Sequence, residues 1–270
     1  MSARRPLEGR TVVVTRAAGQ ARALSRLLEN AGARVLEVPT IAIEPPPSWE
    51  PLDRALEELA AFDWVVFTSV NAVRQVQARL RARGLDWEAL RTRRVAAIGP
   101  ATAAALAEHG VAVAVTPGEY VAEDLLHHLA AVVRPGERVL LPRAAGARDV
   151  LSAGLRGLGA EVVEVTAYVT RPATERSGRL REALAGGDVD VVTLTSSSTA
   201  RSLAEAFGPE ERRRWLAAVT VAAIGPITAA TAARYGLRVE IVPREYTIPA
   251  LAAAIVQHFE GRAAEGRVRT

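Results

Sequence analysis

The chain of 270 residues contains no cysteine and no lysine, and only 4% of its residues are aromatic. Without cysteine it can form no disulfide, thiolate metal site, iron–sulfur cluster or cysteine nucleophile. Without lysine it can form neither a Schiff base nor lysine-anchored pyridoxal phosphate, because both need a side-chain amine. All 34 basic residues are arginines, a bias that a GC-rich genome explains.

Long apolar runs are also absent. No stretch reaches the roughly 18 residues that would span a membrane, and the first thirty residues contain arginines where a secretory signal needs a continuous apolar segment. We therefore expect a cytoplasmic protein without membrane contact. The net charge is +4, but the arginines alternate with acids along predicted helices. This pattern argues against a nucleic-acid partner and suits a small polyanion.

Several motifs of cofactor and metal enzymes are missing. No G-x-G-x-x-G follows a predicted strand, a Walker motif is impossible without lysine, and no G-x-S-x-G elbow occurs. The histidines form no H-x-x-x-H pair; they are His109, His127, His128 and His258. The sequence therefore offers no dinucleotide fingerprint, no P-loop and no evident histidine metal site.

The chain contains an internal repeat. VAAIGPATAAALAEHG (95–110) returns as VAAIGPITAATAARYG (221–236). The alignment extends outward at a nearly constant offset, pairing 12–45 with 139–172, 63–74 with 190–201, and VTPGEY with VPREY. Such constancy over more than a hundred residues indicates a tandem duplication.

Each copy alternates short apolar, β-branched runs with longer amphipathic segments. Such strands between helices are typical of a parallel sheet covered on both faces. The pattern predicts an α/β protein with two flavodoxin-like, doubly wound parallel-sheet domains. In the first copy we expect strands at 12–15, 34–43, 64–68, 94–98 and 112–115, and helices at 19–31, 51–60, 71–83, 100–109 and 121–133.

One strand in each copy is unusually long, alternates in polarity near its end and stops at a proline. We interpret these two strands as a two-stranded β-ladder hinge between the domains. If they pair antiparallel, the first strand–helix–strand of each copy can join the sheet of the other copy; two simple tandem domains remain the alternative. The exchange gives these boundaries: 1–38 with 172–262 for the first lobe, 44–166 for the second, 39–43 and 167–171 for the hinge strands, and 263–270 for a flexible tail.

Ligands of open α/β sheets bind beyond the carboxyl ends of the strands. Here those positions are rich in Ser, Thr, Gly and Pro, and they expose hydroxyls and backbone N–H groups at helix N-termini, where carboxylates or phosphates bind. The alternative is that each Ser or Thr is only a helix cap. The segments are TRAAG (15–19), FTSVNA (67–72), IGPAT (98–102), LPRAAG (141–146), LTSSSTA (194–200) and IGPIT (224–228).

Tyr168 interrupts the duplication, because Ile41 occupies its equivalent position in the first copy. The residue either packs over the hinge or presents a phenol at the mouth of a cleft, where it can donate a proton.

The duplicated halves, FTS followed by Asn71, AIGPxT before an Ala-rich helix, and TAYVTRP at the crossover resemble the uroporphyrinogen-III synthase family over residues 10–259. The resemblance implies a bilobal monomer without metal or cofactor. It also implies the closure of linear hydroxymethylbilane to uroporphyrinogen III, with loss of water and inversion of ring D through a spiro-pyrrolenine.

In this interpretation Tyr168 is the catalytic residue. Arg16 and Arg143, equivalent in the two copies, contact substrate carboxylates. The remaining substrate-binding residues are Thr15, Ser69, Asn71, Thr102, Ser196, Ser197, Gly225 and Thr228. Two rival interpretations are a bilobal binding module without catalysis, which is usually exported, and a Rossmann-type nucleotide enzyme, which needs the missing glycine fingerprint.

Overall fold

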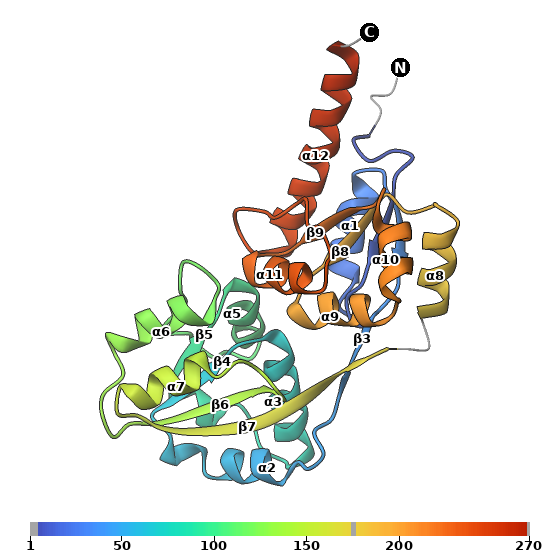
Figure 1. Ribbon diagram of the computed structural model, residues 1–270. Helices are drawn as coiled ribbons and strands as arrows, with labels where there is room; N and C mark the ends of the chain where they lie inside the picture. Colours follow the sequence, from blue (N-terminus) through green and yellow to red (C-terminus); the bar gives the residue numbers. More distant parts are fainter. Residues whose placement is uncertain (1–4, 174–176, 269–270) are drawn as a thin grey trace. The chain divides into compact units, whose positions relative to one another are not determined.

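The structure, a computed structural model, describes residues 5–173 and 177–268. It divides into two units. One comprises the residues up to Ala42 together with those from Arg171 onward, and the other comprises Ile43–Thr170. Each unit contains a sheet with helices on both faces (Figure 1), which confirms the predicted α/β class.

The Ile43–Thr170 unit is built on a five-stranded sheet. Its strands, in spatial order, are β3 (Ile41–Glu44), β7 (Glu161–Pro172), β6 (Arg138–Ala144), β4 (Trp64–Phe67) and β5 (Arg94–Ala97). The pairs β7–β6, β6–β4 and β4–β5 are parallel. The helices are α2 (Glu50–Glu57), η1 (Leu59–Ala61), α3 (Val70–Ala82), α4 (Glu88–Arg91), α5 (Pro100–Ala107), α6 (Ala122–Ala130) and α7 (Val150–Gly157).

The other unit contains a four-stranded, fully parallel sheet. Its strands, in spatial order, are β2 (Arg34–Glu37), β1 (Thr11–Val14), β8 (Val191–Leu194) and β9 (Thr220–Ala223). The helices are α1 (Arg22–Asn30), α8 (Ser177–Ala185), α9 (Ser197–Glu205), α10 (Pro209–Leu216), α11 (Pro226–Arg234) and α12 (Ile248–Val268). Strands β1 and β2 come from the first copy of the repeat, and β8 and β9 come from the second. The sheet therefore combines both copies.

Continuous apolar strands form because both faces of each sheet are buried. In β1, Val12 and Val14 pack with residues of α1 and α12, whereas Val13 packs with residues of α8 and α9. In β4, Trp64 and Val66 pack toward α6 and α7. Val65 and Phe67 lie on the opposite face of the strand and pack toward α2 and α3. Every residue of both strands is buried, as a two-sided parallel sheet requires.

The predicted long strand 34–43 is split into β2 and β3. The break contains Pro39, which has no N–H to donate to a ladder, although Val38 N and Thr40 N donate to the carbonyls of Val14 and Thr15. The repeat places Thr166 at the position of Pro39, and β7 continues there without interruption. The chain passes between the two units within β3 and within β7, which are neighbours in the sheet.

One strand expected from the sequence is absent. Residues 112–115 form no strand: they make a single bridge, Ala96 with Val115, matched in the second copy by Ala222 with Ile241. A proline two residues later, at Pro117, ends this edge segment. Helix α12 extends into the predicted tail 263–270 as far as Val268, because the Ala, Glu and Arg residues there favour helix. The flexibility of this tail stays a prediction.

Candidate functional site

In the unit containing β1, parallel pairing brings the carboxyl ends of β1, β8 and β9 to one edge of the sheet. Six of the predicted site residues follow these strands, two after each strand. They are Thr15 and Arg16, Ser196 and Ser197, and Gly225 and Thr228. This edge is therefore one candidate binding surface.

The Thr15 side chain has a structural role. It is fully buried, its Oγ1 donates to the carbonyl of Thr193 (2.6 Å), and its own carbonyl accepts from Thr40 Oγ1 (3.2 Å). These bonds tie the end of β1 to β8 and to the segment after β2. Thr15 thus leaves the set of proposed substrate contacts, whereas the neighbouring Arg16 is half-buried.

Ser196 and Ser197 organise the start of α9. Ser196 Oγ accepts from Thr199 N (3.1 Å) and Thr199 Oγ1 accepts from Ser196 N (3.0 Å), so the two residues form a capping box. Ser197 Oγ accepts from Thr231 Oγ1 (2.9 Å), a bond that joins α9 to α11. Both serines are half-buried. Ser196 is therefore a helix cap, as one of the two interpretations of the sequence held. This role does not prevent the hydroxyl of Ser196 or Ser197 from also contacting a ligand.

The helices α5 and α11 begin differently, with a glycine that has no side chain to act as a cap. Gly99 and Gly225 lie against tyrosine rings: a Cβ added to Gly99 would approach Tyr120 to 3.1 Å, and one added to Gly225 would approach Tyr246 to 3.0 Å. The first turns of both helices thus keep backbone N–H groups at the positive end of the helix dipole.

The tyrosines behind these glycines were not among the predicted site residues. The signal for them was already in the repeat, where VTPGEY and VPREY align after each IGP segment. Thr102 and Thr228, each in the first turn of its helix, are buried.

In the Ile43–Thr170 unit, Ser69, Asn71 and Thr102 follow β4 and β5 at the carboxyl edge of the sheet. Ser69 is the N-cap of α3, where its Oγ accepts from Ala72 N (3.1 Å). The same Oγ lies 3.0 Å from the hydroxyl of Tyr168. Asn71 also hydrogen-bonds with this phenol. The structure therefore brings Ser69, Asn71 and Tyr168 together.

Tyr168 is only 7% exposed and packs in the core between the five-stranded sheet and α2 and α3. Burial raises the pKa of its hydroxyl, and the hydrogen bonds with Ser69 and Asn71 oppose this shift without cancelling it. The phenol is thus held neutral and protonated well above neutral pH, the state that a proton donor needs.

Arg143 does not match its predicted role. The side chain is 8% exposed, and its guanidinium donates to Glu164, to the carbonyl of Ala147 and to Asp149 (3.1 Å). Because its charge and its donors are engaged within the protein, we remove Arg143 from the proposed substrate contacts.

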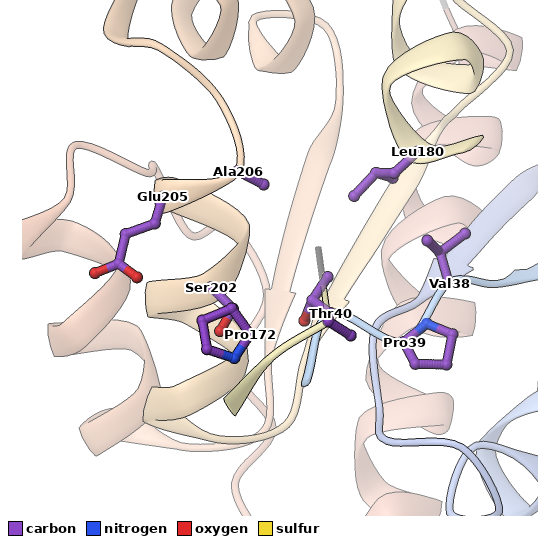
Figure 2. A pocket seen from close by; sticks show the side chains of 9 residues that line it. Val38, Pro39, Thr40, Pro172, Leu180, Ser202, Glu205 and Ala206 are labelled. Carbon is purple, nitrogen blue, oxygen red and sulfur yellow. The ribbon is translucent and has the colours of Figure 1, made fainter. Parts of the chain in front are cut away.

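A separate pocket of about 270 Å³ lies between the Val38–Thr40 segment, α8 and α9 (Figure 2). Apolar side chains such as Leu180 and Pro172 line most of it, and Glu205 contributes a carboxylate. None of the predicted site residues lines this pocket. An apolar wall with an acid suits no polyanion, so we do not place the candidate site here.

Residues 5–173 and 177–268 contain neither a metal-binding cluster nor a membrane-spanning helix. This part of the chain contains no group of three or more His, Cys, Asp or Glu residues placed to hold a metal ion. Within the same ranges, no helix has the length and apolar character needed to cross a membrane.

A family model, two related sequences and one solved structure indicate the same family. A family model described as uroporphyrinogen-III synthase HemD matches residues 22–253. A uroporphyrinogen-III synthase from Synechococcus elongatus is 38% identical, over 94% of this chain and 97% of that protein. One from Chlorobaculum parvum is 31% identical, over 92% of this chain and 98% of that protein. The crystal structure of a mutant uroporphyrinogen III synthase from Thermus thermophilus has the same fold, with a TM-score of 0.66 at 23% identity over 93% of this chain and 99% of that one.

Proposed function

The chain belongs to the uroporphyrinogen-III synthase family, and from this premise we propose how its own residues carry out the reaction. The protein is a cyclising lyase that closes linear hydroxymethylbilane to uroporphyrinogen III with loss of water and inversion of ring D. The observation that carries this conclusion is the family match, which spans strands of both sheets. Catalysis, rather than binding alone, follows from that membership.

The substrate is a flexible chain of four pyrroles with eight carboxylates, so its binding needs many hydrogen-bond donors. The carboxyl edges of the two sheets supply them. In the Gly-Pro starts of α5 and α11, an acidic arm takes the place of the missing side-chain cap and accepts from the first backbone N–H groups. The proposed substrate contacts are Arg16, Ser69, Asn71, Thr102, Ser196, Ser197, Gly225 and Thr228.

We assign Tyr168 the role of proton donor. The C–O bond of the terminal hydroxymethyl group breaks, and the hydroxyl takes a proton from the phenol and leaves as water. The phenolate then takes the N–H proton of the same pyrrole, so that a neutral, electrophilic azafulvene remains. Ring D attacks it through its substituted carbon to form the spiro-pyrrolenine, which fragments and closes again with the ring inverted. The neutral, hydrogen-bonded state of Tyr168 supports this role.

Closure without inversion happens readily in the absence of an enzyme, so the protein mainly has to select one geometry. Fixed hydroxyls and helix N-termini achieve this by orientation and by preorganised dipoles. The scheme uses no cofactor and no metal.

We further propose that the chain works as a monomer in the cytoplasm. Sedimentation of the purified protein tests the oligomeric state, and cell fractionation tests the location.

The test is a product analysis. Purified protein receives freshly generated hydroxymethylbilane, the products are oxidised, and chromatography separates isomers I and III. We expect isomer III in excess, with isomer I alone in a heat-inactivated control. Isomer I alone from the active protein would contradict the proposal and would favour a binding module.

A further inference from the structure

Strand β7 contains one residue more than its neighbour β6 at the level of the candidate site. Arg143 pairs with Thr166 and Ala144 pairs with Tyr168, so Ala167 has no partner across the ladder. A residue inserted in this way is a β-bulge, and bulges redirect the side chains that follow them.

The bulge decides which face of the sheet Tyr168 occupies. In a regular strand, side chains alternate between faces. Val165 and Ala167 pack in the core beneath α2 and α3, so strict alternation would direct Tyr168 to the face covered by α6 and α7. Tyr168 instead packs in the same core as Ala167. The bulge therefore turns the phenol toward Ser69.

The bulge is held by a backbone hydrogen bond from the segment that follows β6, which we call the β6–α7 segment (residues 145–149). Ala145 N donates to the carbonyl of Tyr168 (2.9 Å). Little packing supports this segment: a pocket of about 200 Å³ lies against residues 144–146, and a Cβ added at Gly146 would meet nothing within 4 Å.

Arg143 joins the β6–α7 segment to β7. Its guanidinium donates to Glu164 on β7 and to the carbonyl of Ala147 in the segment. It also reaches Ser152 Oγ on α7 (3.3 Å). The second oxygen of Glu164 lies 2.8 Å from Arg156 Nη2. The ion pair between the buried Arg143 and the half-buried Glu164 thus connects both strands beside the bulge.

From this geometry, and resting on the role proposed for Tyr168, we infer that Arg143 and Glu164 are positioning residues for the reaction. Their ion pair fixes the β6–α7 segment, the segment fixes the bulge, and the bulge aims the hydroxyl of Tyr168 at Ser69. Neither residue contacts substrate. A displacement of about 1 Å at a reacting group can lower a rate by as much as about a hundredfold, so loss of the pair acts on kcat.

The experiment compares Arg143→Met with Arg79→Met in the full chain. Arg79 is a matched control because it forms an ion pair with Asp53, is similarly shielded from solvent and lies in the same unit, on α3. Three quantities are measured: kcat, KM and the pH titration of the Tyr168 ring-carbon NMR signal in 13C-tyrosine protein, assigned with Tyr168→Phe.

We expect Arg143→Met to lower kcat by about tenfold or more, with KM within about twofold of wild type. The pKa of Tyr168 should fall toward its ordinary value, because the ring gains access to water. Arg79→Met should leave kcat and the pKa of Tyr168 near their wild-type values. Arg143→Lys should recover part of kcat, since the ammonium keeps the positive charge near Glu164 but lacks the planar fork of donors of a guanidinium.

If Arg143→Met does not fold, Glu164→Gln takes its place, because the amide keeps the shape and removes the charge. A Tyr168 signal that titrates as in wild type in these variants overturns the inference, whatever the activity. Wild-type turnover by Tyr168→Phe would refute the catalytic role instead, and the NMR titration would still decide whether Arg143 positions the ring.

Discussion

The hydroxyl of Tyr168 and the Oγ of Ser69 lie 3.0 Å apart, within hydrogen-bonding distance. Ser69 also caps α3, so a single oxygen connects the proposed proton donor with the start of a helix. The sequence separates the two residues by 99 positions, and the order β7–β6–β4 in the five-stranded sheet brings them together.

Replacement of Tyr168 by Phe should lower turnover by about one to two orders of magnitude, the range of general-acid contributions. Tyr235→Phe is the matched control, because that residue lies at the end of α11 and outside the proposed site. Initial rates of uroporphyrinogen III formation provide the measurement. Equal rates for Tyr168→Phe and the control would remove Tyr168 from the mechanism.

Ser69→Ala should have two separable effects. Loss of the N-cap lowers the free energy of unfolding by about 1 kcal/mol, which urea denaturation measures. The pKa of Tyr168 should rise further, because the hydrogen bond with Ser69 lowers it in the wild type. A fall of this pKa in the NMR titration would be the contrary result.

The alkaline stability of the protein should depend on Tyr168. Burial raises the pKa of its phenol in the folded state, so the stabilising contribution is complete below the ordinary tyrosine pKa of about 10 and is lost as pH rises through the folded-state pKa. Denaturation curves between about pH 9 and 11 should therefore fall more steeply for wild type than for Tyr168→Phe. Parallel curves would show that the folded state does not favour the protonated form of Tyr168.

Glu137 should contribute to the loss of folding stability at acidic pH. Burial acts to raise its pKa, but hydrogen bonds from Arg94 (2.6 Å), Arg134 N (3.0 Å) and Trp64 Nε1 (3.0 Å) outweigh it, and the pKa lies below its usual value. The resulting stabilisation is present above the unfolded-state pKa of about 4.3 and is lost as pH falls through the folded-state value. Glu137→Gln should flatten the loss of unfolding free energy below about pH 5, as followed by tryptophan fluorescence.

Gly225→Ala tests the uncapped start of α11. The new methyl group would lie 3.0 Å from the Tyr246 ring, so the ring and the first turn must shift. We expect KM for hydroxymethylbilane to rise several-fold with a smaller change in kcat, because ground-state binding is affected. Gly157→Ala, where a Cβ meets nothing within 4 Å, is the control that should keep the wild-type KM.

The order of strands and helices was predictable because apolar runs and the internal repeat are local signals. The exchange of strands between the copies was one of two alternatives that the sequence left open, since the pairing of β1 with β8 depends on contacts between distant segments. The repeat also misled in one case: it suggested the same role for Arg16 and Arg143, but the burial of Arg143 against Glu164 depends on tertiary packing. The bulge that directs Tyr168 leaves no mark in the pattern of residues.

The combination of both copies in one sheet sets the order in which the protein can assemble. Strands β4 to β7 all lie in one continuous stretch of chain. Strand β1, by contrast, pairs with β8, where Val12 lies opposite Val191, and β8 is synthesised much later. As the polypeptide leaves the ribosome, the middle stretch can close on itself while the apolar surface of β1 stays uncovered until β8 has been synthesised. Neither copy of the repeat would therefore fold as an independent domain.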